Sequence, residues 1–180
     1  MSNDKLDSGR VRRLMQAIGK RTIEYMKEEL AIPVSKAHQA GDDVVRMQLR
    51  ELTSILALDA EIRLLVAFSF DHGLAEQILT ASAEGLEIAD DERDEMRGEA
   101  VAEMINIVAG NAIAGHEVNG KTISITPPVV INEAKSITRH KGATFRTIEV
   151  TTGAGMMSIH FVGPKEFFTM NLDYAEGINE

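Results

Sequence analysis

The 180-residue chain contains no cysteine and no tryptophan, and only 4% of its residues are aromatic. Without cysteine it can form neither a disulfide nor a thiolate metal site. Because aromatic residues are scarce, we expect a core built from Leu, Ile, Val, Ala and Met. No run approaches the roughly 20 apolar residues that a membrane helix needs, and the N-terminus lacks the apolar segment of a signal peptide. We therefore expect a cytoplasmic protein that does not bind membranes, with one core of ordinary size.

Positive charge is also in short supply, because the formal net charge is −9. This argues against a nucleic-acid-binding surface, which would need clustered Lys and Arg. Nine acidic residues lie between Glu84 and Glu103, against two arginines in the same stretch. They fit a solvated helix start, where carboxylates favour the helix dipole, or an acidic docking surface for a basic partner. The sequence leaves both interpretations open.

The motifs of several common enzyme classes are missing. The chain has no nucleophile elbow of the Gly-x-Ser-x-Gly type, no phosphate-binding Gly-x-x-x-x-Gly-Lys loop and no Rossmann fingerprint. No two histidines have the helical spacing of metal ligands, so we interpret all five as loop or surface residues. The five are His38, His72, His116, His140 and His160. We expect the chain to bind no metal and no cofactor.

The order of apolar patterns predicts an α+β fold with a mostly antiparallel sheet, in one domain spanning residues 1–180. Apolar residues recur with a helical period from Val11 to Leu30, and Pro33 ends this helix. Further helices are predicted over 74–83 and 92–115, the latter capped by Asp90 or Asp91. Strands are predicted over 44–58, 63–70, 122–126, 129–131, 146–152, 156–162 and 167–172. Turns or loops are predicted over 38–43, 59–61, 72–73, 135–142 and 153–155, with frayed ends over 1–8 and 175–180.

The predicted helix over 92–115 carries a polar stripe that packing does not require. At 100° per residue, one face holds Glu99, Glu103, Asn106 and Gly110. The opposite face holds Val101, Ile105, Val108 and Ala112, which can enter the core. Asn106 is a poor mid-helix residue, and Gly110 costs about 1 kcal/mol relative to alanine. We interpret the stripe as a site that grips a partner and orients a water molecule; the alternative is an ordinary exposed helix face.

Residues 98–112 resemble the active-site helix of the CheX branch of the CheC/CheX/FliY phosphatases. That family's pattern has an acidic residue or Ser, then Glu, then Asn, at the positions of Glu99, Glu103 and Asn106. A proline follows about twenty residues later, which is here Pro127 or Pro128. The resemblance covers roughly residues 52–131. One departure from the family pattern is that Glu99 is a methylene longer than the usual Asp. The chain contains a second Glu-x-x-Asn at 176–179, which lies in the tail and carries no expected role.

The resemblance implies a phosphatase for the aspartyl phosphate of a CheY-like response regulator. Asn106 would orient the attacking water, and Glu103 would dock the regulator by pairing with its active-site lysine. Glu99 and Gly110 would contribute to partner binding. Gly110 would let the partner's backbone approach or, alternatively, would let the sheet pack closely against the helix. Mg²⁺ would be held by the regulator rather than by this chain, and a homodimer is implied. The alternative is a catalytically inactive CheX-like domain that binds a regulator or serves as a signalling scaffold.

Overall fold

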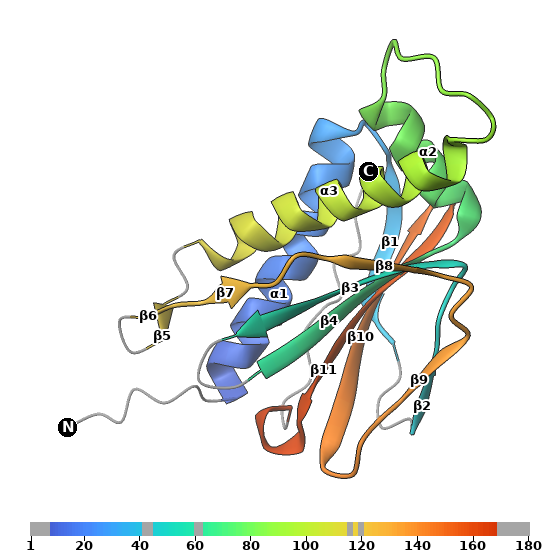
Figure 1. The fold of residues 1–180 in the computed structure, drawn as a ribbon. Coiled ribbons are helices and arrows are strands. Elements are labelled where there is room, and N and C mark those ends of the chain that lie inside the picture. Colours follow the sequence, from blue (N-terminus) through green and yellow to red (C-terminus); the bar gives the residue numbers. More distant parts are fainter. Residues whose placement is uncertain (1–7, 41–44, 60–62, 115–116, 119–120, 169–180) are drawn as a thin grey trace.

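A computed structural model of the chain describes residues 8–40, 45–59, 63–114, 117–118 and 121–168 (Figure 1). The predicted α+β fold with a mostly antiparallel sheet is confirmed. The predicted frayed ends at 1–7 and 175–180 lie outside the described residues, and so does the second Glu-x-x-Asn at 176–179. Ser8, which we expected to be frayed, is the first residue of a helix.

Three α-helices, one π-helix and one 3₁₀-helix are formed by the described residues. The α-helices are α1 (Ser8–Glu24), α2 (His72–Ser82) and α3 (Arg93–Ile113). A π-helix at Tyr25–Glu29 prolongs α1 almost to the end predicted at Leu30. Both the first helix and the long helix are therefore confirmed.

The main sheet has seven strands, and every pairing in it is antiparallel (Figure 1). Its order is β1-β10-β11-β4-β3, with β7 and β8 both pairing along the outer edge of β3. The strands are β1 (Val34–Gln39), β3 (Leu52–Asp59), β4 (Arg63–Phe70), β7 (Ser124–Ile125), β8 (Val129–Asn132), β10 (Ala143–Thr152) and β11 (Gly155–Pro164). Two small ribbons lie outside it: β2 (Arg46–Gln48) with β9 (Ser136–Thr138), and β5 (Glu117–Val118) with β6 (Lys121–Thr122).

The core lies between one face of this sheet and the helices α1 and α3 (Figure 1). Its members are mostly aliphatic, as expected, but five of the six phenylalanines are also fully buried. They are Phe68, Phe70, Phe145, Phe161 and Phe168. The few aromatic residues are therefore concentrated in the interior, where each removes a large apolar area from water.

Several predicted boundaries are wrong, mainly where short strands lack an apolar pattern. Residues 38–39, predicted as a turn, end β1, and the loop predicted over 135–142 contains β9. The strand predicted over 44–58 is two strands, because β2 pairs with β9 and only β3 joins the main sheet. The strand predicted over 167–172 begins inside a 3₁₀-helix at Lys165–Phe167, and Phe168 follows that helix. Residues 169–172 lie outside the described part of the chain.

Two helix starts also differ from the prediction. The predicted break at 72–73 is the first turn of α2, where the backbone N–H of His72 donates to a carboxylate oxygen of Glu51 at 2.5 Å. A residue distant in sequence thus satisfies a free donor of the first turn, which sequence periodicity does not reveal. The residue preceding α3 is Glu92 rather than Asp90 or Asp91, and no side-chain capping bond forms there.

Candidate functional site

Helix α3 has one buried face and one exposed face, as its periodicity predicts. Val101, Ile105 and Val108 have no exposed surface and belong to the hydrophobic core. Gly98 is buried on the same helix, and a Cβ atom at this position would lie 3.4 Å from a methyl group of Val130 in β8. Helix α3 therefore passes close to β8 at this point.

The opposite face of α3 borders a groove of about 400 Å³. Glu99, Glu103 and Asn106 are all exposed, and all three line the groove. Ala102 completes this wall. The second wall is the segment that joins β7 to β8, formed by Ile125, Thr126, Pro127 and Pro128. Figure 1 shows this segment running alongside α3. The structure therefore brings together three of the four predicted site residues and the prolines of the family pattern.

This second wall, called the proline wall below, contains a β-bulge. β3 pairs with β7 at Leu58 and Ile125, and with β8 at Ile55 and Val129. Between these two pairs β3 advances by three residues, from Ile55 to Leu58, whereas the opposite edge advances by four, from Ile125 to Val129. The opposite edge therefore contains one extra residue, which is the mark of a bulge. Proline is tolerated in a sheet at such bulges and at edges because it has no N–H to donate to the ladder.

Thr126 closes the hydrogen-bond ladder beside the bulge. Its backbone N–H donates to the carbonyl of Ala57 at 3.0 Å. Its hydroxyl oxygen accepts the N–H of Ala57 at 2.9 Å. Sequence reasoning missed this residue, although an alternating strand that ends in Thr-Pro-Pro on a sheet edge is a detectable signal for a bulge.

Gly110, the fourth predicted site residue, does not line the groove. A Cβ atom built on it would meet no described atom within 4 Å. Close packing against this chain therefore does not explain the glycine. Of the two roles considered for it, approach of a partner's backbone and tight packing on the sheet, the second is wrong.

Neither Glu103 nor Asn106 forms a hydrogen bond or an ion pair with any residue that the structure describes, so both polar groups are available to a partner. The charge of Glu103 nevertheless reaches the π-helical end of α1. Burial raises the pKa of the Tyr25 hydroxyl, and the carboxylates of Glu29 and Glu103 raise it further. The α3 side of the groove is acidic, because Glu99 and Glu103 both line it.

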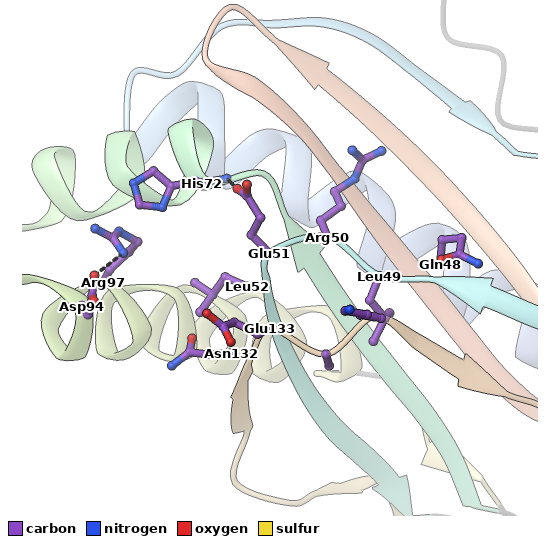
Figure 2. Close-up of a pocket in the computed structure, with 12 residues that line it drawn as sticks. Gln48, Leu49, Arg50, Glu51, Leu52, His72, Asp94, Arg97, Asn132 and Glu133 are labelled. Carbon is purple, nitrogen blue, oxygen red and sulfur yellow. Dashed lines mark hydrogen bonds and ion pairs between the residues drawn. The ribbon is translucent and has the colours of Figure 1, made fainter.

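A larger groove of about 890 Å³ lies elsewhere, between the β2–β3 link and the starts of α2 and α3 (Figure 2). Its two arginines are already engaged within the chain. Arg50 donates to Asp71 at 2.8 Å, and Arg97 donates to Asp94 at 2.8 Å. Because both arginines are already paired, and because three residues of the predicted stripe line the smaller groove, the groove at α3 is the better candidate despite its size.

The acidic stretch between Glu84 and Glu95 is exposed along its length, apart from Ile88 and Arg93. Arg93 and Arg97, the two arginines near it, are both paired with Glu76 of α2. Exposure is compatible with a solvated helix start and with a docking surface, so both interpretations of this stretch remain.

Of the four histidines that the structure describes, His160 departs most from the expected loop or surface position, and His38 is half-buried in β1. His116 lies outside the described residues. His160 lies in β11, is 3% exposed, and shares a 2.9 Å hydrogen bond between its Nδ1 atom and the hydroxyl of Thr147. Its Nε2 atom is buried without a partner among the described residues. Burial lowers the pKa of His160 to about 4, and nearby Arg50 lowers it as well.

Neither a metal-binding cluster nor a membrane-spanning helix occurs among the described residues. They contain no group of three or more His, Asp or Glu side chains placed to hold a metal ion. No helix among them is both long and apolar enough to cross a membrane.

The family model of the chemotaxis phosphatase CheX matches residues 52–151, which span α2, α3, the bulge and most of the sheet. This match covers more than half of the chain. The chain therefore belongs to the CheX family. No curated protein sequence matches it significantly.

Solved structures agree with this assignment at the level of the fold. The chemotaxis protein CheX from Desulfovibrio desulfuricans superposes with a TM-score of 0.66 at 16% identity, over 82% of this chain and 97% of the other. A crystal structure of the CheX–CheY–BeF₃–Mg²⁺ complex from Borrelia burgdorferi contains a chain with a TM-score of 0.63 at 16% identity, over 83% of this chain and 96% of the other. The middle domain of FliM from H. pylori shares the fold more distantly, with a TM-score of 0.55 at 9% identity, over 87% and 91%.

Proposed function

We propose that this chain hydrolyses the aspartyl phosphate of a CheY-like response regulator. The observation that carries the proposal is the groove that places an exposed carboxylate, Glu103, and an exposed amide, Asn106, opposite a rigid proline wall. Membership of the chemotaxis phosphatase CheX family supports it. The similar chain in the complex with CheY, BeF₃ and Mg²⁺ supports a CheY-like partner.

In this proposal, Asn106 positions the attacking water. The amide both donates and accepts hydrogen bonds but is too weak a base to remove a proton. It therefore acts by holding the water in line with the phosphorus–oxygen bond that breaks. Water adds to phosphorus, the aspartyl carboxylate leaves with the bonding electrons, and both protons of the water remain on the product, dihydrogen phosphate.

Glu103 supplies the docking charge. One helical turn separates it from Asn106, so an ion pair between Glu103 and a lysine of the regulator sets the depth at which the amide enters the regulator's site. Glu99 lines the same groove one turn earlier and extends the negative wall. Gly110 lies beyond the groove and leaves open space where the regulator's backbone can approach.

This chain itself needs no cofactor in the proposed reaction, because Mg²⁺ belongs to the regulator's site. We also propose a homodimer, which the CheX resemblance implies. Light scattering of the purified chain tests the dimer, and a mass of one 19.7 kDa protomer would contradict it.

The function is tested by following the loss of radiolabelled phosphate from CheY-type regulators of the same genome, with catalytic amounts of this chain. Wild-type chain should accelerate the loss through many turnovers, and the Asn106→Ala variant should not. If no regulator loses phosphate faster although one of them binds, the chain is not a phosphatase.

That second outcome would favour a regulator-binding or scaffold domain without turnover. The FliM middle domain shares this fold, so the fold alone does not establish turnover. Turnover with substoichiometric chain separates the two functions, because a sequestering protein can change the phosphate lifetime only of the regulator it holds.

A further inference from the structure

One side chain, that of Thr126, helps to tie the proline wall of the groove to β3. Ala57 in β3 is only 7% exposed, so its N–H needs a partner within the protein. The bulge removes the regular ladder acceptor at this point, and the hydroxyl oxygen of Thr126 replaces it. Together with the bond from its own N–H to the Ala57 carbonyl, Thr126 fixes the start of the Pro127–Pro128 segment to β3 from two directions.

We propose that Thr126 is a positioning residue, which holds Pro127 and Pro128 at the distance from α3 that admits the aliphatic stem of a basic side chain of the regulator. This inference rests on the proposed function, because it takes the regulator as the occupant of the groove. It assigns the second wall a role in partner recognition that is separate from the chemistry at Asn106.

One wall of the groove is acidic and the other is apolar, which matches the charged head and the hydrocarbon stem of a basic side chain. The α3 wall carries the carboxylates of Glu99 and Glu103, whereas the other wall presents Ile125 and the two proline rings. Lys and Arg bury their hydrocarbon stems along apolar surface while the charged head pairs with an acid. Proline has almost no side-chain freedom to lose, so a wall made of prolines is ordered before the partner arrives.

The test compares the dependence of hydrolysis on regulator concentration for wild type, Thr126→Val and Thr126→Ser. Valine keeps the shape of threonine but cannot accept the N–H of Ala57, whereas serine keeps the oxygen. We expect Thr126→Val to raise KM about 5- to 10-fold, in the range of a single interface contact, with kcat within about twofold of wild type. Thr126→Ser should restore KM to nearly the wild-type value.

A second variant tests the proline wall without removing the Thr126–Ala57 bonds, so that an effect on docking can be distinguished from a general loss of stability. Pro128→Ala removes a ring from the wall while leaving both Thr126–Ala57 bonds intact, and it should raise KM by about two- to fivefold. The matched control is Thr138→Val in β9, an exposed threonine outside the groove, which should leave KM and kcat unchanged. Thermal unfolding of each variant shows that the protein assayed is folded.

The outcomes separate this inference from the function on which it rests. A wild-type chain that accelerates no regulator overturns the proposed function, and the inference with it. If the wild type is active but Thr126→Val and Pro128→Ala both keep its KM, the inference alone is overturned. A fall in kcat without a rise in KM would also overturn it, because Thr126 would then act on the reaction rather than on docking.

Discussion

Glu103 and Asn106 lie three residues apart on α3, are both exposed, and line the same groove opposite Pro127 and Pro128. In the proposed function, one of them attracts the regulator and the other acts at the reacting phosphorus. Their replacement should therefore change different kinetic constants, although both belong to a single helix turn.

Replacing Asn106 by alanine should remove turnover while leaving the fold intact. We expect kcat to fall by about 100-fold or more, a loss comparable to that of other groups that position or stabilise the transition state. The free energy of unfolding should change by less than about 0.5 kcal/mol, because the side chain is exposed. The measurement is single-turnover loss of phosphate, with Asn111→Ala, another exposed asparagine of α3, as the matched control. Equal rates for wild type and Asn106→Ala would remove this residue from the mechanism.

Replacing Glu103 by glutamine should weaken docking through the loss of one charge. We expect KM for the phosphorylated regulator to rise about 5- to 10-fold, because a tenfold change corresponds to about 1.4 kcal/mol. Salt should raise the wild-type KM more steeply than that of the variant, since screening acts on the ion pair that the variant has lost. Titrations at two ionic strengths measure both effects. Parallel salt dependences would show that Glu103 does not pair with the regulator.

Gly110→Ala should make the chain more stable but less able to bind the regulator. The new Cβ meets no described atom, and alanine stabilises a helix interior by about 0.5 to 1 kcal/mol relative to glycine. Urea unfolding should show this gain, while KM should rise because a partner's backbone can no longer approach as closely. An unchanged KM would leave Gly110 without a role in binding.

Gly73→Ala should destabilise the fold, whereas Gly110→Ala should stabilise it. A Cβ atom on Gly73 would lie 2.5 Å from the carbonyl oxygen of Ala154, in the turn between β10 and β11. This oxygen belongs to the backbone and cannot rotate away, so we expect a loss of about 1 to 3 kcal/mol in the free energy of unfolding. The same urea experiment measures it, and a variant as stable as wild type would show that the turn can move.

His160 should make the fold sensitive to mild acid. Its pKa is lowered to about 4 in the folded chain by burial and by Arg50, against an ordinary value of 6.5. The unfolded chain therefore binds the proton more readily between these values, so stability is complete above pH 6.5 and is lost as the pH falls toward 4. From pH 7 to pH 5 we expect a loss of about 2 kcal/mol from this residue.

The control for this prediction is a pair of variants. In His160→Gln, the difference between pH 7 and pH 5 in the free energy of unfolding should shrink by about that amount. In His140→Gln it should stay as in the wild type, because His140 is exposed. Identical pH dependences for the wild type and His160→Gln would contradict the burial of a neutral imidazole.

The parts of the fold that could be predicted are those with a long periodic pattern. The stripe of Glu99, Glu103 and Asn106 on α3 followed from helical spacing, and it is confirmed as one exposed face. The parts that could not be predicted depend on partners distant in sequence. Strands of three residues such as β2 exist only because β9 pairs with them, and no short-range pattern encodes that pairing.

The site shows the same division. Glu103 and Asn106 lie on a single helix, so their proximity followed from the sequence. Thr126 could not be identified, because its role depends on the N–H of Ala57, which belongs to a strand 69 residues earlier. His160 was misplaced as a surface residue, since a polar residue in a strand gives no sign of which elements cover it.

The two prolines of the bulge have one more consequence, which concerns the solubility of the chain. Among the described residues, no strand pairs with the far side of β7 and β8, so this border of the sheet offers free backbone groups to other chains. Pro127 and Pro128 interrupt that border with two successive positions that have no N–H, and leave only a two-residue and a four-residue stretch. Such short stretches are poor templates for uncontrolled strand addition. The residues that shape the groove therefore also protect the sheet from aggregation.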